Sequence, residues 1–513
     1  MKDERFSLNN LFSYLAVFLV FATMFAFSWL HGGARADALL PTIPWLWVFL
    51  CEVLLCFPQR HPHEDPLSAR RRVWMSLKRD PMFYLVVFFL VILAIPMANR
   101  GLCPDCDAAK IMAGVNPDPP LPFAPFCVSA PEHLGVILWF VPILTAMLAV
   151  KHGLGRSGKR VLMEMLVWNG AALAILGFVQ RATGATSAFW GHTPAAADFF
   201  SVFGYPNMGG AFFTMLFAFS VGVWQMRVSE VAQMPHIDHN KGSVSTERLN
   251  RALRAHYPLV AVVLNFFAAL STLCRAAIIL VFVLAALAFL YYECSLLLAR
   301  HHRARRVKSA ALVFFGAILF VISIFVFAPP QLAKEIDSLN SYNVADRVAG
   351  KGQYHVRVAT AIFKDHPFFG VGGWGYRHYF KNYLRPDEKN HIQIEGGANV
   401  HNDYLQFLCE HGVVGVGCLF AILVMLLSPV FTDWYRLLMA SRFLKNDKAP
   451  PMPRAIYCLP AGTFWILLGN IALLIHAFGD CPMRSAACLS MFFVTLACAP
   501  GYIPRDLEET SNE

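Results

Sequence analysis

Residues 81–98 read PMFYLVVFFLVILAIPMA and contain no charged side chain. An α-helix rises about 1.5 Å per residue, so a run of this length crosses most of a hydrocarbon layer about 30 Å thick. Similar apolar runs recur along the whole chain of 513 residues. The pattern predicts a polytopic membrane protein that crosses the bilayer as α-helices, because a helix satisfies its own backbone hydrogen bonds in lipid.

The composition excludes a water-soluble enzyme. Hydrophobic residues make up 57% of the chain, charged residues only 15%, and the mean hydropathy is +0.49. Lys and Arg outnumber Asp and Glu by 43 to 33. In a membrane protein this excess is first interpreted by loop position. No basic module interleaved with aromatic residues occurs, so we expect no nucleic-acid partner.

The apolar windows predict twelve transmembrane helices and no β-structure. The first run follows a charged segment without a small-residue cleavage site, which favours a retained helix over a removable signal peptide. We expect residues 1–328 to hold nine helices, 329–404 to form one large loop with short helices, and 405–513 to hold three helices and a tail. The expected helices are 11–30, 39–57, 81–98, 134–150, 161–180, 208–226, 257–273, 275–297, 309–328, 405–430, 458–478 and 484–499.

The loops alternate in basic content, which predicts the orientation. Arg and Lys cluster in alternate loops, and these loops are expected to be cytoplasmic and to contact anionic lipid headgroups. Both chain ends are then cytoplasmic and the loop 329–404 is periplasmic. The protein is expected in a bacterial inner membrane, with membrane lipids as partners. The short outer loops carry only Arg35, Arg100, Lys110, Arg181, Arg275 and Arg484.

Cysteines on the expected outer side favour a disulfide. Cys103, Cys106 and Cys127 share one outer loop and Cys481 lies in another. A bacterial periplasm is oxidising, so a structural bridge is the favoured interpretation. The pair Cys103-Pro-Asp-Cys106 is alternatively a redox or metal pair. Without a second matched pair or a nearby histidine, we expect no metal site.

The spans themselves give little support for coupled transport. Carriers usually place ionisable residues deep in the membrane. Here Glu52, Glu164 and Glu293 lie toward the inner ends of their runs, and no acid at the middle of a run has an evident basic partner.

Several arginines on the outer side are candidates for anion binding. Arg275 lies at a tight hairpin between two runs, where it either snorkels or grips two phosphate oxygens. Arg181, just beyond the fifth run, is typical of an interfacial anchor and is also counted among the candidate substrate-binding residues. Arg347 and Arg357 flank or enter a helical stretch expected at Gln353–Asp365 in the large loop.

A glycine-rich turn follows that stretch and precedes a histidine at the start of the tenth run. Glycines at 370–375 allow positive φ and a close approach to a ligand, so Gly372, Trp374 and Tyr376 are candidate substrate contacts. His401 would lie at the outer helix start, with Asn402 or Asp403 as the cap. Such a histidine is either a general base or an interfacial structural residue.

These motifs resemble those of the O-antigen ligase family, which also includes O-antigen polymerases and protein O-oligosaccharyltransferases. The resemblance rests on Asp365–Gly375, on a histidine, ten residues and a glycine at His401–Gly412, and on Tyr205–Asn207 before the sixth run. It covers about residues 160–430. The family motif of an Arg, three intervening residues and a Leu is approximated at Arg275, where Ile279 replaces the leucine.

The resemblance implies a membrane glycosyltransferase that uses no metal and no other cofactor. Members move a glycan from an undecaprenyl diphosphate carrier to an acceptor at the periplasmic face. The acceptor is expected to be lipid A core or a similar lipid or glycan; a polymerase and a protein-acceptor enzyme are the alternatives. Outside the class, a glycan-lipid exporter is the competing possibility, although neither duplicated halves nor a polar cavity is evident.

The resemblance also implies roles for individual residues. Arg275 and Arg357 would stabilise the leaving diphosphate, although Arg347 matches the loop arginine equally well. His401 would take the proton from the acceptor hydroxyl in one displacement, which predicts inversion at the anomeric carbon. Asp403 is a further candidate contact and the alternative activating group.

Overall fold

The computed structural model describes most of the chain and is helical throughout the described part. An isolated β-bridge joins Phe200 and Phe203. Arg347, Cys103, Cys106 and the expected helix 309–328 lie outside the described residues. These are 8–33, 41–61, 64–99, 119, 121, 123–191, 199–232, 244–298, 351–386, 399–443 and 459–502.

Each of the other eleven expected helices coincides with a helix of the structure. Among the described residues, six helices are long and apolar enough to cross a membrane, and five further apolar helical segments are shorter. The multi-pass expectation is supported, while the number twelve stays a prediction. The helices are α1 (Leu8–Trp29), α3 (Ile43–Leu55), α5 (Pro81–Ala98), α7 (Ala130–Leu148), α8 (Arg156–Ala182), α9 (Pro206–Ala232), α11 (Pro258–Ser271), α12 (Arg275–Leu298), α19 (Asp403–Phe443), α20 (Ala461–His476) and α21 (Ala486–Cys498).

Two amphipathic helices lie in segments that the hydropathy pattern left as loops, namely α4 (Pro66–Arg79) and α10 (Val244–His256). α4 begins where the Asp65 carboxylate accepts hydrogen bonds from the N–H groups of Leu67 and Ser68, both at 3.0 Å. Asp80 then caps α5 in the same way, through Met82 N–H at 3.1 Å. Asp residues followed by Pro at the first helical position are strong helix starts. These caps separate a polar helix from the apolar helix that follows it.

Acidic residues near the ends of helices are held in ion pairs. Asp80 accepts from Lys151 Nζ at 2.6 Å, and Glu164 accepts from Arg227 at 2.5 Å. Glu164, which lies toward the inner end of an expected run, thus binds an arginine of α9. These pairs neutralise charge at the points where polar loops give way to apolar helices.

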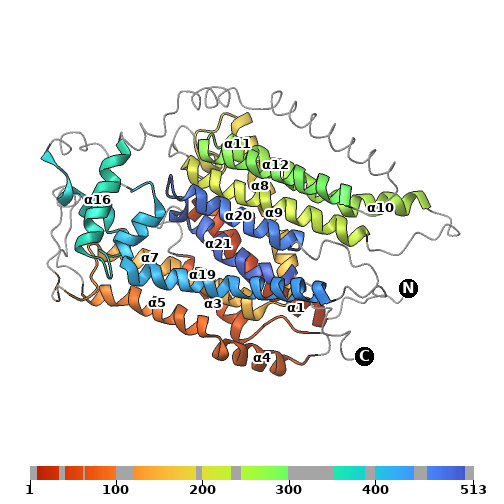
Figure 1. Cartoon of the computed structure of the whole chain (residues 1–513), viewed down its shortest axis with the longest axis horizontal. Helices are drawn as coiled ribbons and strands as arrows, with labels where there is room; N and C mark the ends of the chain where they lie inside the picture. Colours follow the sequence, from red (N-terminus) through yellow and green to blue (C-terminus); the bar gives the residue numbers. More distant parts are fainter. Residues whose placement is uncertain are drawn as a thin grey trace. The chain divides into compact units, whose positions relative to one another are not determined.

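The chain divides into two compact units. The first comprises residues 1–162, 342–429 and 474–497, and the second comprises 163–341, 430–473 and 498–513. In the second unit α9 packs against α10, α11 and α12 (Figure 1). Its interior is rich in phenylalanine, and Phe200, Phe203, Phe212 and Phe213 form edge-to-face and tilted ring contacts.

In the first unit α3 packs against α1 and α7, and α5 packs against α7. Figure 1 shows α5, α7 and α19 alongside one another, with the amphipathic helix α16 (Lys351–Asp365) at one end. The expected helical stretch Gln353–Asp365 is therefore confirmed. α16 is fixed there by a buried cluster that includes Val358, Ile362, Val371, Tyr376 and Cys409. This cluster joins α16, the glycine turn and α19 into one body.

Candidate functional site

The helix α19 is broken at Gly412, and the glycine turn fills the break. Gly412 has φ 63° and ψ −173°. In an unbroken helix the N–H groups of Val413 and Val414 would donate to the carbonyls of Cys409 and Glu410. Here they donate to Pro367 O at 2.8 Å and Phe368 O at 3.1 Å instead.

The carbonyls of Cys409 and Glu410 accept hydrogen bonds from the glycine turn instead. Val371 N–H donates to Cys409 O at 3.1 Å, and Gly372 N–H donates to Glu410 O at 2.9 Å. All four backbone groups are thus satisfied although the helix is interrupted. The two motifs that the sequence places forty residues apart form one hydrogen-bonded structure.

Glycine is required on both sides of this contact. A Cβ at Gly412 would lie 2.2 Å from Phe368 O, and one at Gly370 would lie 2.4 Å from the Glu410 carbonyl carbon. Both residues also have positive φ, 63° and 68°. The expected positive φ is confirmed, and the backbone that the turn approaches is that of α19, while the expected approach to a ligand stays a prediction.

His401 stands just before α19 in a strained backbone conformation. Its φ is 54°, in the left-handed region that L-residues rarely occupy. The cap is Asn402, whose Oδ1 accepts from Leu405 N–H at 3.0 Å. The buried Gln406 holds the preceding segment, because its Oε1 accepts from Val400 N–H at 3.0 Å. Local strain of this kind persists only where neighbours enforce it, and it often marks functional sites.

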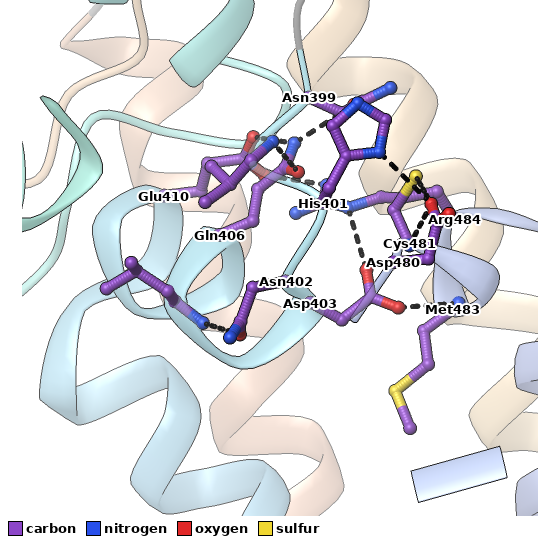
Figure 2. Close-up of polar contacts among 12 residues, drawn as sticks. Asn399, His401, Asn402, Asp403, Gln406, Glu410, Asp480, Cys481, Met483 and Arg484 are labelled. Carbon is purple, nitrogen blue, oxygen red and sulfur yellow. Dashed lines mark hydrogen bonds and ion pairs between the residues drawn. The ribbon is translucent and has the colours of Figure 1, made fainter. Parts of the chain in front are cut away.

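The His401 ring is paired with a buried carboxylate from another part of the chain. His401 Nδ1 lies 3.2 Å from Asp480 Oδ1 (Figure 2). The His401 side chain is 46% exposed and that of Asp480 is 4% exposed. The same Asp480 oxygen accepts from Cys481 N–H at 2.7 Å, which fixes the carboxylate. A partly exposed histidine held by a carboxylate at one ring nitrogen is suited to proton transfer.

Beside this pair lies a buried ion network. Arg484 donates from Nη1 to Glu410 Oε2 at 2.7 Å, and its Nε lies 3.6 Å from Asp403 Oδ1. Asp403 also accepts from Met483 N–H at 2.8 Å. Burial by itself lowers the pKa of Arg484, but Glu410 and Asp403 raise it overall, so this guanidinium stays charged. Two carboxylates therefore face one guanidinium in this buried network.

Trp374 lies between this network and a second arginine. The guanidinium carbons of Arg377 and Arg484 lie 3.8 Å and 4.8 Å from the centre of its ring. Glu132 accepts from His378 Nε2 at 2.9 Å and lies 3.6 Å from Arg377. Stacking on an aromatic face suits the planar guanidinium. Trp374, expected to contact substrate, therefore also joins two ion networks.

His133 attaches the glycine turn to the transmembrane helices. Its Nδ1 accepts from Gly373 N–H at 2.7 Å, and its Nε2 lies 2.7 Å from Leu93 O, to which it donates. The two contacts define a single neutral tautomer. His133 is buried, and it is a structural residue that nothing in its local sequence singled out.

Tyr376 contacts His355 of α16, and His355 in turn lies near His401. Its hydroxyl lies 2.8 Å from His355 Nδ1, and the His355 and His401 ring centres are 6.1 Å apart. Burial, assisted by the nearby His401, lowers the pKa of His355 to about 4. Arg357 is close enough to Tyr376 to act on its hydroxyl electrostatically, and its Nη1 donates to Tyr383 O at 3.3 Å.

The remaining two arginines belong to the second unit. Arg275 begins α12 directly after the α11–α12 turn, where Leu273 has φ 57°. Arg181 Nη2 donates to Ser271 O at the end of α11, and its guanidinium lies 5.3 Å from the Phe200 ring centre. Arg181 thus reaches the hairpin that carries Arg275.

Six of the expected site residues lie in the first unit and are linked through the contacts described above. They are His401, Asp403, Gly372, Trp374, Tyr376 and Arg357. Sequence reasoning missed Asp480 and Arg484, and it treated Glu410 only as part of a motif. Arg484 was placed in a short outer loop as one more basic residue. The sequence signal that could have identified Arg484 was its position close to Asp480 and Cys481, in a loop between two apolar runs.

The cysteines are accounted for only in part. Cys127 Sγ donates to Pro96 O at 3.3 Å, and Cys481 is a thiol whose Sγ lies 3.3 Å from Asp480 Oδ1. These two are not bonded to each other, so the expected bridge does not join them. His401, Asp480 and Cys481 are also a possible metal-donor set, since one atom from each lies within 4.8 Å of the others.

Comparison with known proteins identifies a family for part of the chain. Residues 260–440 match the family model described as O-antigen ligase. The resemblance drawn from the motifs is thereby confirmed. The matched segment contains Arg275, Arg357 and His401 and ends before Asp480 and Arg484. No curated protein matches the chain.

Proposed function

With the O-antigen ligase family identified over residues 260–440, we propose that the chain is a ligase-type glycosyltransferase of the bacterial inner membrane. The donor is a glycan on undecaprenyl diphosphate, and the acceptor is lipid A core or a similar molecule at the periplasmic face. Membrane lipids surround the apolar helices. The transfer is a single displacement with inversion at the anomeric carbon, and it needs neither metal nor cofactor.

The observation that carries this proposal is the pair formed by His401 and Asp480, 3.2 Å apart. We place the proton of the neutral His401 ring on Nδ1, which donates a hydrogen bond to Asp480, so that Nε2 is the nitrogen that takes the acceptor's proton. The His401 ring is half exposed, so an acceptor hydroxyl can reach Nε2. Asp480 acts as a positioning residue, because it holds the ring in one tautomer and stabilises the imidazolium that forms.

We assign different charged groups to the acceptor and to the donor. The Asp480 carboxylate beside His401 favours a transient imidazolium there. As the family resemblance implies, the diphosphate is assigned to Arg357 and Arg275, with Arg347 and Arg181 as further contacts. Arginines fixed at a developing negative charge supply the stabilisation that a metal would otherwise give.

The rest of the site positions these groups. Gly372 and Tyr376 hold the turn against α19 and α16, and Trp374 orients Arg484. A rigid supporting set keeps reacting atoms in geometry suited to attack. Asp403 is proposed as part of that support, because its oxygens face Met483 N–H and Arg484.

The test is transfer by purified protein in nanodiscs, with a lipid-linked glycan and a lipid A core acceptor. Joined product with inverted linkage supports the ligase. Carrier-linked full-length glycan should accumulate in a deletion strain, whereas single repeat units would indicate a polymerase. Joining to a protein would indicate the oligosaccharyltransferase. Movement of glycan-lipid across the bilayer without any joining would indicate an exporter and overturn the proposal.

A further inference from the structure

Three side chains with different donor atoms converge at the open edge of the site. Asp480 Oδ1 lies 3.2 Å from His401 Nδ1 and 3.3 Å from Cys481 Sγ. The three donor atoms all lie within 4.8 Å of one another. Neighbouring side chains in a chain usually diverge, but Asp480 and Cys481 turn to the same point (Figure 2).

The two separations to Asp480 Oδ1, 3.2 Å and 3.3 Å, are close to the edge length of a metal coordination tetrahedron. Zn²⁺ binds nitrogen and oxygen at about 2.0–2.2 Å and sulfur at about 2.3 Å in tetrahedral sites, which places ligand atoms about 3.3–3.7 Å apart. A nitrogen, an oxygen and a sulfur together favour Zn²⁺ over Mg²⁺ or Ca²⁺, which prefer oxygen alone.

We infer that His401, Asp480 and Cys481 form a Zn²⁺ site and that its occupation stops glycan transfer. The inhibitory part rests on the proposed role of His401 as general base. Zinc binding forms one bond each to Nδ1, a carboxylate oxygen and the Cys481 sulfur, and the thiol proton passes to solvent. No electron transfer is involved.

The surroundings favour a cation and leave a path for it. The buried network beside the three donors holds two carboxylates, Asp403 and Glu410, for one guanidinium, Arg484. Asp403 is close enough to Asp480 for the two carboxyl groups to act on each other electrostatically, so a cation at the three donors lies near this second carboxyl group. The His401 side chain is 46% exposed, so solvent reaches one member of the donor set, and a water would complete a four-ligand site.

Inhibition follows from which ring nitrogen carries the proton. As a base, His401 keeps its proton on Nδ1, facing Asp480, and its lone pair on Nε2. Zinc on Nδ1 moves the proton of the neutral ring to Nε2. The nitrogen that should accept the acceptor's proton then carries one already, and Asp480 no longer faces an N–H group. The zinc form therefore has no base in the required place.

The site is tested with full-length protein treated with chelator and then titrated with ZnCl₂ or CoCl₂. Cobalt replaces zinc in such sites and gives a thiolate-to-metal charge-transfer band when sulfur is a ligand. We expect one equivalent to bind with this band, and MgCl₂ to have no effect. Transfer should proceed at the full rate in chelator and fall as zinc binds.

Cys481→Ser separates the metal site from the reaction. It should keep the transfer rate measured in chelator, lose the cobalt band, and need at least about tenfold more zinc for inhibition. Cys488→Ser, which alters another fully buried cysteine of the first unit, is the matched control and should behave like the parent. Unchanged zinc binding in Cys481→Ser, or no cobalt band in the parent, would overturn the inference. Stoichiometric binding through Cys481 that leaves transfer unaffected would keep the metal site but contradict the role of His401 in the proposed function.

Discussion

The N–H of Val413 donates to the carbonyl of Pro367 at 2.8 Å, although a continuous helix would send it to Cys409. This bond exists because α19 is interrupted at Gly412. It fixes the glycine turn, and through that turn Trp374 and Tyr376, relative to the start of α19. The geometry around His401 therefore depends on a backbone arrangement that only glycine permits at this position.

Gly412→Ala should destabilise the protein and abolish most of its transfer activity. The backbone at φ 63° and ψ −173° lies in a region used almost only by glycine, and a Cβ would lie 2.2 Å from Phe368 O. We expect a loss of at least about 2 kcal/mol in unfolding free energy. Gly417→Ala, on the same helix with open space at its Cβ, should be neutral or slightly stabilising. Thermal unfolding of both variants in nanodiscs measures the difference, and equal melting temperatures would contradict the account.

Arg484→Leu should be strongly destabilising. The substitution leaves Glu410 and Asp403 buried without their arginine, and breaking a buried pair in this way costs about 3–5 kcal/mol. Arg436→Leu removes an exposed partner of Asp433 and should cost less than about 1 kcal/mol. Denaturant unfolding of the two variants provides the comparison. A similar small effect in both would mean that the buried network contributes little.

His355 should make the protein less stable at mildly acidic pH. Its pKa is about 4 in the folded protein, below its ordinary value of 6.5. Between these values the unfolded chain binds more protons, so stability decreases as pH falls from about 6.5 toward about 4. His355→Gln should show a weaker dependence in that interval. Melting temperatures across the interval test this, and parallel curves for the variant and the parent would exclude the effect.

Arg357→Ala and Arg275→Ala should each lower the transfer rate about a hundredfold or more, because each is assigned to the leaving diphosphate. Lys at either position should restore only part, since it lacks the planar fork. Lys364→Ala, at an exposed position of the same helix as Arg357, should retain the parental rate. Rates for single and double variants decide whether the arginines serve one step. Multiplicative losses in the double variant would show that they act independently.

The apolar helices could be predicted because each run carries its own length and hydropathy. α16 was also expected, and the tenth run was expected to begin at 405 with Asn402 or Asp403 as its cap; α19 begins at Asp403 and the cap is Asn402. α4 was missed because its residues Pro66–Arg79 are mostly polar, and its packing face of Ala69, Val73 and Leu77 is narrow.

The partners of the site residues could not be predicted, because they depend on contacts distant in sequence. Nothing near His401 indicates that Asp480 will face its Nδ1, and nothing near Arg484 indicates Glu410 as its partner. The glycine turn and the His401–Gly412 spacing were recognised separately. That Val371 and Gly372 complete the broken helix follows only from the folded backbone.

The central claim is that His401 takes the acceptor's proton and does not hold the donor. His401→Ala should bind the lipid-linked donor within about threefold of the parent but transfer glycan about a hundredfold to ten-thousandfold more slowly. Asp480→Asn should also slow transfer and leave donor binding intact, since it disturbs only the tautomer. His378→Ala alters a similar histidine–carboxylate pair whose ring is only 9% exposed, so it controls for the loss of such a pair.

The most direct measurement is the single-turnover transfer rate of His401→Ala with saturating donor, in nanodiscs, beside its donor affinity and its melting temperature. The account predicts a folded protein with near-parental donor affinity and a transfer rate lowered at least about a hundredfold. Transfer at the parental rate would contradict the claim and return His401 to a structural role at the membrane interface. Donor affinity lost in step with the rate would contradict it as well, by placing His401 with Arg275 and Arg357 at the diphosphate.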